Sequence, residues 1–152
     1  MDDSAVAIPG IEDIRAAAGR VAGVAVITPL LENAALNDRL GGRVLFKAET
    51  LQRTGSFKVR GAFNKIAALK PEERARGVVA FSSGNHAQGV ASAARHFGIR
   101  AVIAMPSDAP AVKVDNVRAL GAEVVSFDRF RDDRMTVVKP WLDAGMVLVA
   151  AG

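Results

Sequence analysis

Cysteine and tyrosine are both absent from this chain of 152 residues. The lack of cysteine excludes disulfide bonds, thiolate catalysis and cysteine-ligated metals. The lack of tyrosine removes the phenol group as an acid or a base. Chemistry that depends on a thiolate or a phenolate is therefore excluded.

Aromatic residues make up only 5% of the chain, and charges of both signs are dispersed along it, with a net charge of +4. A nucleic-acid partner calls for a basic stripe with stacking aromatic residues, so we expect none. No apolar run approaches the roughly 18 residues that span a bilayer, and the first residues lack the basic and apolar segments of a secretory signal. The acidic residues show no metal-ligand spacing. We therefore expect a cytoplasmic protein with no membrane partner and no metal site.

Half of the residues are apolar, and from residue 78 onward two kinds of segment alternate along the chain. Short continuous apolar runs are typical of strands, and the segments between them carry apolar residues at helical spacing. Such an alternation is typical of a parallel sheet that is covered by helices on both faces, with right-handed crossovers. The sequence thus predicts an α/β fold. The predicted strands are 78–81, 101–105, 124–127 and 146–150.

The last helical pattern contains Pro140, and a proline inside a helix removes a hydrogen bond and clashes with the preceding turn. We therefore expect that helix to stop or kink near Lys139. Upstream of the sheet, we expect another helix that begins after Ser56 and ends at Pro71. The hydroxyl of Ser56 would cap the first free amides of this helix. The remaining spacing predicts helices over 11–21 and 31–40 and a strand over 43–48.

A lysine stands in the first turn of the helix that follows Ser56, within the segment Ser56-Phe57-Lys58-Val59-Arg60-Gly61-Ala62. The unpaired amides of this turn and the nearby charge of Arg60 both disfavour an ammonium group at Lys58. A neutral amine can attack an aldehyde, as Schiff-base lysines do. Taken alone, the segment is also compatible with a surface lysine on a capped helix.

A polar turn, Ser82-Ser83-Gly84-Asn85-His86, follows the strand at 78–81 and begins the next helix. Several backbone amides converge there with the helix dipole behind them, which suits an anion. Plain N-capping explains the same residue types, and His86 could equally satisfy the helix start. Gly84 and Gly89 lack the G-x-G-x-x-G spacing, so a nicotinamide cofactor is not expected.

Together, the two motifs resemble the threonine and serine dehydratase branch of the fold-type II pyridoxal-phosphate enzymes, which also contains serine racemase. The resemblance implies a three-layer parallel sheet of the tryptophan synthase β type and the cofactor pyridoxal 5'-phosphate. Only the last 25 residues or so match poorly. The matching segments are Thr28-Pro29-Leu30, Phe46-Lys47-Ala48-Glu49, 54–62, 82–89, Pro106-Ser107-Asp108-Ala109-Pro110 and Leu120-Gly121-Ala122-Glu123-Val124.

The resemblance implies a role for each matching residue. Lys58 would form the Schiff base with the cofactor and take the α-proton from the substrate. Phe57 would pack beside the cofactor ring, and Asn85 would hydrogen-bond the cofactor 3′-oxygen. Ser83 would act as the second catalytic residue, since it matches the serine that faces the opposite side of the substrate in racemising relatives. The residues that would hold the substrate carboxylate are Ser82, Ser83, Asn85 and His86.

The implied reaction is the dehydration and deamination of L-threonine or L-serine to a 2-oxo acid and ammonia. The expected partner is therefore a small hydroxy amino acid, and a full-length member is expected to form a homo-oligomer. Threonine synthases usually have Asp after the lysine, and Val59 at that position favours a dehydratase. Serine racemase is the alternative within the family.

Members of this family are roughly twice as long as this chain. Their glycine-rich phosphate loop, their partner for the pyridine nitrogen and their cation ligands lie in the second half. The resemblance assigns residues 1–76 to part of the large cofactor-binding domain, with exposed apolar surface, and residues 77–152 to a small four-stranded α/β domain. We expect a truncated dehydratase, and the alternative is a non-catalytic fragment or stand-alone binding module.

Overall fold

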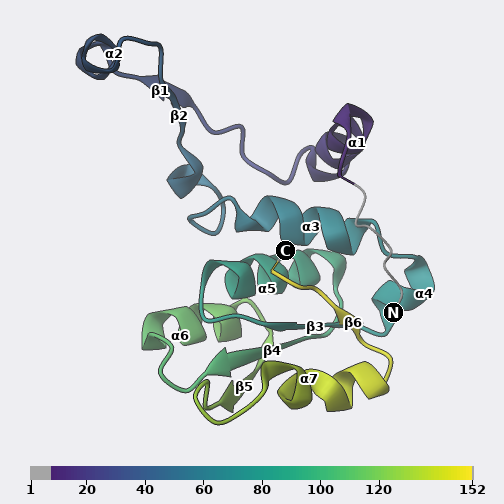
Figure 1. Ribbon diagram of the computed structural model, residues 1–152. Coiled ribbons are helices and arrows are strands. Elements are labelled where there is room, and N and C mark those ends of the chain that lie inside the picture. Colours follow the sequence, from purple (N-terminus) through teal and green to yellow (C-terminus); the bar gives the residue numbers. More distant parts are fainter. Residues whose placement is uncertain (1–7, 152) are drawn as a thin grey trace.

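The computed structural model describes residues 8–151, so residues 1–7, in which no secretory signal is expected, lie outside the described part. A four-stranded parallel sheet with strand order β5-β4-β3-β6 forms the centre of the fold (Figure 1). All four predicted strands are confirmed, close to their predicted bounds. They are β3 (Val78–Phe81), β4 (Ala101–Pro106), β5 (Glu123–Phe127) and β6 (Val147–Leu148).

The register of the sheet is fixed by two parallel neighbours of β3. Val78 is the partner of Ala101 in β4 and of Val147 in β6. Each crossover contains a helix, and these helices are α5 (Asn85–Phe97), α6 (Ala111–Ala119) and α7 (Arg134–Asp143). The chain therefore runs outward from β3 through β4 to β5, and then returns across the sheet to place β6 on the opposite side of β3.

Alternate residues of the strands enter two separate cores, one on each face of the sheet. Val78 and Ile103 pack in the core under α5 and α6, whereas Val79 and Val102 pack in the core under α7. This alternation follows from the period of two in a strand. Burying each of these side chains contributes about 1.5–3 kcal/mol, which explains why the strands are continuous apolar runs.

Helix α3 (Lys58–Ala67) lies on α5, on the side of α5 that faces away from the sheet (Figure 1). Its apolar face, which includes Ala62 and Ile66, is buried in the same core as the sheet. The ring of Phe63 packs against those of His96 and Phe97, with centroids 5.0 and 4.9 Å apart. The lysine-bearing helix is thus attached to the sheet through α5.

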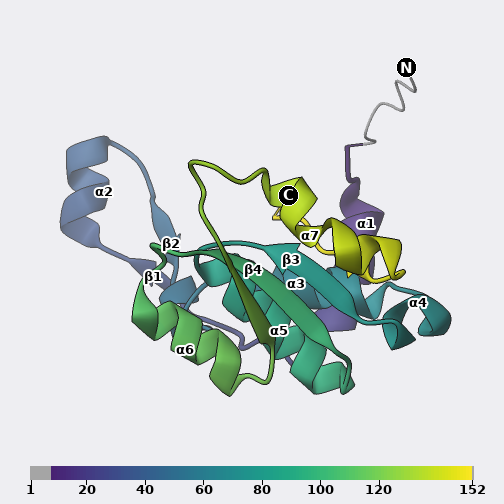
Figure 2. The ribbon, with the colours of Figure 1, turned by 90° about the horizontal axis from the view of Figure 1, so that it is seen from below.

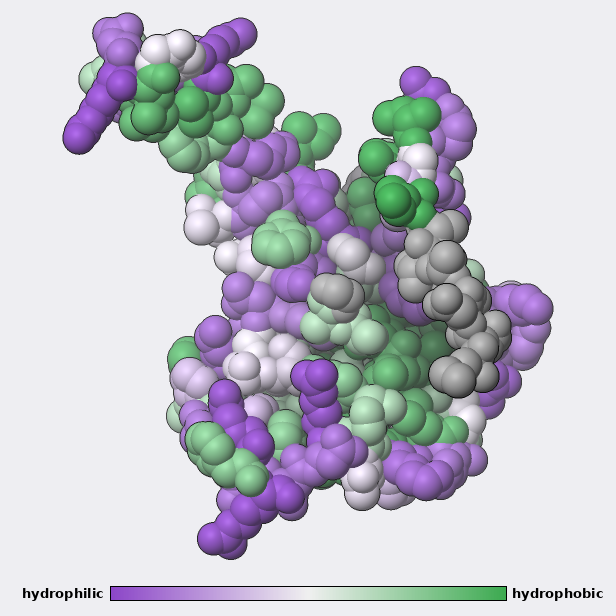
Figure 3. All heavy atoms as spheres, in the orientation of Figure 1, coloured by the Kyte–Doolittle hydropathy of each residue, from purple (hydrophilic) through white to green (hydrophobic). Residues whose placement is uncertain are grey.

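An arm extends away from this body in both ribbon views (Figures 1 and 2). It consists of β1 (Leu30–Glu32), α2 (Ala34–Leu40) and β2 (Leu45–Lys47), with β1 and β2 antiparallel. Figure 3 shows apolar surface over the arm, which confirms the expected exposed apolar surface within residues 1–76. The exposed apolar residues here are Ile27, Leu30, Leu31, Leu40, Leu45 and Phe46.

Several local predictions upstream of the sheet need correction. The helix predicted over 11–21 is confirmed as α1 (Ile11–Val21), but the segment predicted as helix over 31–40 begins with strand β1. The hydroxyl of Ser56 does not cap α3: it is buried and has no hydrogen-bond partner among the described residues. The reason is that α3 begins at Lys58, one residue too late for Ser56 to reach its first amides.

The two proline predictions also need correction. Helix α3 ends before Pro71, which instead begins a separate short helix, α4 (Pro71–Ala75). Proline suits this first helical position because its missing N–H has no partner there in any case. Pro140 lies inside α7, which continues to Asp143. The packing of Val138 in the core under α7 offsets the lost hydrogen bond.

Candidate functional site

The strand order reverses between β3 and β6, at the carboxyl ends of these two neighbouring strands. Beyond β3 the chain turns into α5 on one face of the sheet, whereas α7 on the other face leads into β6. Doubly wound sheets bind their ligands at such a reversal. The polar turn Ser82–Asn85 follows β3, and the segment 149–151 follows β6, so both reach this position.

Lys58 approaches the same position from α3. Its Nζ donates a hydrogen bond to the backbone oxygen of Ala151 over 3.1 Å, and it lies 5.3 Å from the centre of the Phe57 ring. His86 is buried, and its Nε2 lies 2.8 Å from the backbone oxygen of Val149. Because a carbonyl oxygen only accepts, His86 carries its proton on Nε2. The segment 149–151 therefore lies between the lysine and the histidine.

A cavity of about 440 Å³ opens between α3 and the end of β6. Lys58 and Lys65 contribute two ammonium groups to it, and the imidazole of His86 also lines it. The remaining lining is mostly apolar. It consists of Phe57, Gly61, Ala62, Leu148, Val149, Ala150 and Ala151.

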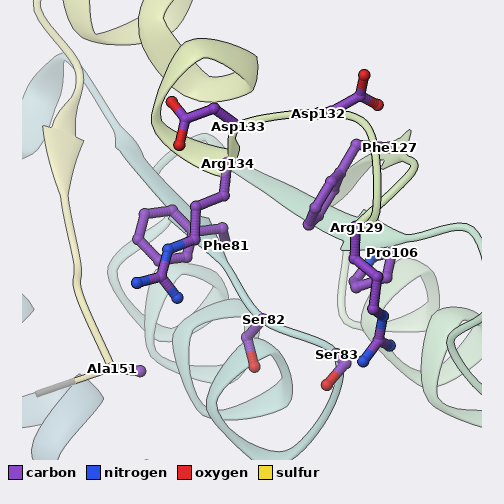
Figure 4. Close-up of a pocket in the computed structure, with 10 residues that line it drawn as sticks. All are labelled: Phe81, Ser82, Ser83, Pro106, Phe127, Arg129, Asp132, Asp133, Arg134 and Ala151. Carbon is purple, nitrogen blue, oxygen red and sulfur yellow. The ribbon is translucent and has the colours of Figure 1, made fainter.

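A second cavity, of about 500 Å³, lies over the polar turn, and Ala151 lines both cavities. Ser82 and Ser83 lie on one side of it, and Arg129 and Arg134 extend from the opposite side, with the end of Arg129 beside Ser83 (Figure 4). Arg129 is paired with Asp108 over 2.7 Å, whereas the Arg134 guanidinium lies 4.8 Å from the centre of the Phe81 ring.

The two carboxylates that line this second cavity do not neutralise it. Figure 4 shows the side chains of Asp132 and Asp133 directed away from the serines. Asp133 caps α7 by accepting hydrogen bonds from the backbone N–H and the hydroxyl of Thr136, and these bonds lower the pKa of Asp133. Two hydroxyls and two guanidinium groups therefore face the cavity, a combination that suits an anionic group.

The residues predicted to form the site are distributed over both cavities. Lys58, Phe57 and His86 line the first, whereas Ser82 and Ser83 line the second. The remaining residue, Asn85, is exposed at the first position of α5 and lines neither cavity. The structure thus brings the two sequence motifs to one end of the sheet, as two adjoining cavities.

Sequence reasoning missed Arg129 and Arg134, because the charged segment 128–134 reads as solvated positions and helix caps. The order of strands along the chain could have indicated that this segment lies near the polar turn. This segment follows β5, whose carboxyl end lies at the same edge of the sheet as that of β3.

A partly buried ion pair ties the start of α3 to the preceding chain. Arg60 donates to Glu49, in the 3-10 turn η1 (Glu49–Leu51), through Nε and Nη2, each over 2.8 Å. Thr28 donates its hydroxyl hydrogen to the same carboxylate over 2.6 Å. The hydrogen bonds from Arg60 are the main reason why the pKa of Glu49 is lowered to about 2. Arg60 is therefore paired with Glu49 at the start of α3.

Residues 8–151 contain no group of three or more histidine or acidic side chains placed to hold a metal ion. None of their helices is long and apolar enough to cross a bilayer.

Comparisons with known proteins agree with this geometry. The L-threo-3-hydroxyaspartate ammonia-lyase of Saccharomyces cerevisiae is 44% identical over 127 residues, which cover 84% of this chain and 39% of that protein. The L-threonine ammonia-lyase of Thermotoga maritima is 53% identical over 115 residues, which cover 76% of this chain and 29% of that protein. The chain therefore spans well under half the length of the curated relatives it matches.

Solved structures give the same result. Maize serine racemase superimposes with a TM-score of 0.85 at 41% identity, over 91% of this chain and 43% of that one. The processed form of threonine deaminase isoform 2 from Solanum lycopersicum gives 0.81 at 37% identity, over 91% and 41% of the two chains. The fold is thus that of the fold-type II enzymes. The family described as "Pyridoxal-phosphate dependent enzyme" matches residues 21–150, and this chain belongs to that family.

Proposed function

We propose that this chain is the N-terminal part of an ammonia-lyase that uses pyridoxal phosphate to convert L-threonine or L-serine to a 2-oxo acid and ammonia. The observation that carries the proposal is the position of the Lys58 amine. It lies at the reversal of strand order, in a cavity that adjoins the one over Ser82 and Ser83. The relatives that are named as ammonia-lyases support the same reaction class.

The residues around Lys58 fit one end of the cofactor. When bound, pyridoxal phosphate supplies an aldehyde that accepts an amine and a ring that delocalises negative charge from the substrate Cα. The first cavity offers the primary amine of Lys58, the ring of Phe57 and, through Lys65, a second ammonium group for a phosphate. Asn85 is exposed at the start of α5, and its proposed role is to hydrogen-bond the cofactor 3′-oxygen.

The chain's own residues would then carry out two tasks. The hydroxyls of Ser82 and Ser83, with the first amides of α5, would hold the substrate carboxylate and orient the Cα–H bond toward Lys58. The amine of Lys58 would take the Cα proton while the β-hydroxyl leaves as water. Water then replaces nitrogen at Cα, so that one hydroxy amino acid gives one 2-oxo acid and one ammonia.

Reductive trapping tests this proposal. The chain is incubated with pyridoxal phosphate, reduced with borohydride and mapped by peptide mass spectrometry. We expect most of the label on Lys58 and a low background level on Lys65. Lys58→Met should lose most of the label, whereas Lys65→Met should keep it. A chain in which Lys58 stays unlabelled would contradict the proposal and favour a stand-alone binding module.

A second substrate class is favoured by the second cavity, namely a hydroxy amino acid with a carboxylate on its β-carbon. Arg134 lines this cavity, and no carboxylate of the described residues lies within ion-pair distance of its guanidinium. Two relatives, 44% and 48% identical, are named L-threo-3-hydroxyaspartate ammonia-lyase.

Calorimetry on the cofactor-loaded protein distinguishes the two substrate classes. If the acidic substrate is correct, Arg134→Leu should weaken the binding of L-threo-3-hydroxyaspartate about tenfold and leave that of L-serine unchanged. Arg131→Leu is a matched control, since Arg131 lies in the same segment but does not line the cavity. Equal losses for both ligands in Arg134→Leu would exclude a specific contact with a second carboxylate.

A further inference from the structure

Helices α3 and α5 meet at Gly89, where no side chain separates their backbones. A Cβ atom added at Gly89 would lie 3.0 Å from the backbone oxygen of Lys58 and 3.1 Å from its carbonyl carbon. It would also lie 3.2 Å from the backbone nitrogen of Val59. All three neighbours are backbone atoms, so they cannot move aside as the end of a flexible side chain can.

This contact differs from those of other helical glycines in the chain. A Cβ at Gly19 in α1, or at Gly61 in α3, would meet nothing within 4 Å. A Cβ at Gly84 would meet the end of the Lys113 side chain, which can rotate away. Gly89 is the position at which a methyl group would push against the backbone of Lys58 itself.

The position of Gly89 along α5 connects this contact to the site. Gly89 lies four residues after Asn85, so the two positions are on the same face of the helix, one turn apart. It lies three residues after His86, whose ring is held by the backbone of Val149. The backbone contact at Gly89 therefore fixes the distance of the Lys58 backbone from the turn that begins α5 and from the chain beyond β6.

We infer that Gly89 is a positioning residue: its missing side chain lets the first turn of α3 rest on α5 and so places the Lys58 amine in its cavity. This inference rests on the proposed function, in which Lys58 reacts with the cofactor aldehyde. Lys65 lies two turns further along α3 and lines the same cavity. Its backbone does not contact Gly89, so the labelling of Lys65 serves as an internal reference for that of Lys58.

The test is Gly89→Ala with the borohydride assay, and the readout is the ratio of label on Lys58 to label on Lys65. Because a displacement of a few tenths of an ångström already disturbs a reacting pair, we expect this ratio to fall about five- to tenfold. The melting temperature should change little, because alanine gains about 1 kcal/mol over glycine in a helix and offsets the strained contact.

Two control variants separate placement from stability. Gly19→Ala adds the same methyl group in open space and should leave the labelling ratio unchanged. Ala93→Gly weakens the buried face of α5 without adding an atom, so it should lower the melting temperature and also leave the ratio unchanged.

Each outcome decides the inference. A folded Gly89→Ala protein with the ratio of the unmodified chain would overturn it. A Gly89→Ala protein that does not fold would also overturn it, because Gly89 would then serve the core rather than the placement of Lys58. Absence of label on Lys58 in the unmodified chain would instead remove the proposed function, and the inference with it.

Discussion

Replacing Glu49 with glutamine should destabilise the fold, because the carboxylate anchors the start of α3 to the preceding chain. Glu49 accepts two hydrogen bonds from Arg60 and one from Thr28. Its side chain is only 16% exposed, whereas that of Arg60 is 34% exposed. Glutamine keeps the shape but removes the charge and turns a donor toward the guanidinium.

The pKa of Glu49 gives the magnitude of this effect. Mainly through the hydrogen bonds from Arg60, that pKa is lowered from 4.5 to about 2. At about 1.4 kcal/mol per unit this corresponds to roughly 3 kcal/mol at most. Solvent screening at the one-third exposed Arg60 reduces the expected loss in Glu49→Gln to about 1–2 kcal/mol.

The sign of the pH dependence follows from the lowered pKa. The contribution of the Glu49 charge is fully present above pH 4.5 and is lost as the pH falls through about 2. The free energies of unfolding of the two proteins should therefore differ by a constant amount near neutral pH. That difference should close between these two pH values.

Urea unfolding of both proteins across this pH range measures the difference. Glu32→Gln is the matched control. Arg43 donates two hydrogen bonds to Glu32 with the same bidentate geometry, over 2.8 and 2.9 Å, but at an exposed position. The control should unfold like the unmodified chain. The reasoning is refuted if Glu32→Gln and Glu49→Gln lose equal stability, or if the Glu49→Gln difference persists at pH 2.

Four further substitutions, of which Gly98→Ala is the control for Gly77→Ala, test local features by thermal unfolding. Ser56→Ala should leave stability unchanged or raise it, because it removes an unpaired buried hydroxyl; a loss of about 1 kcal/mol would instead indicate a cap. Pro140→Ala should raise stability by about 1–3 kcal/mol by restoring a helical hydrogen bond, and a decrease would contradict this. Gly77→Ala should cost about 3 kcal/mol or more, since φ is +88° and the Cβ would lie 2.7 Å from the Arg100 backbone oxygen. Gly98→Ala, with φ of +63° and open space, should cost only about 1 kcal/mol, so equal losses for both glycines would count against the steric argument.

The sheet could be predicted because each strand is a short apolar run that local spacing identifies. The helices between the strands were equally clear, and α5 ends at Gly98, which adopts the left-handed conformation. The arm was less clear, since the three residues of β1 are too few to show a period of two. The division at residues 76 and 77 stays a prediction. Helix α3, from the first part, is buried in the same core as the sheet.

The two motifs predicted which residues form the candidate site but not how these residues are arranged in space. Lys58 and the turn at Ser82–His86 were singled out from residue type and order. That the chain beyond β6 lies between Lys58 and His86 could not be read from spacing, since Ala151 is 93 residues from Lys58. Arg129 and Arg134 were missed for a related reason: they line the cavity over the serines from the segment after β5, Arg129 from the loop and Arg134 from the first position of α7.

By itself, the sequence determined the apolar strands, the helices that cover them, and the lysine and serine motifs, because each depends on residues a few positions apart. Only the tertiary structure decided which side chains share a cavity. That outcome depends on the parallel strand order and on the backbone contact between α3 and α5 at Gly89. Both are contacts between residues distant in the chain, which local periodicity does not specify.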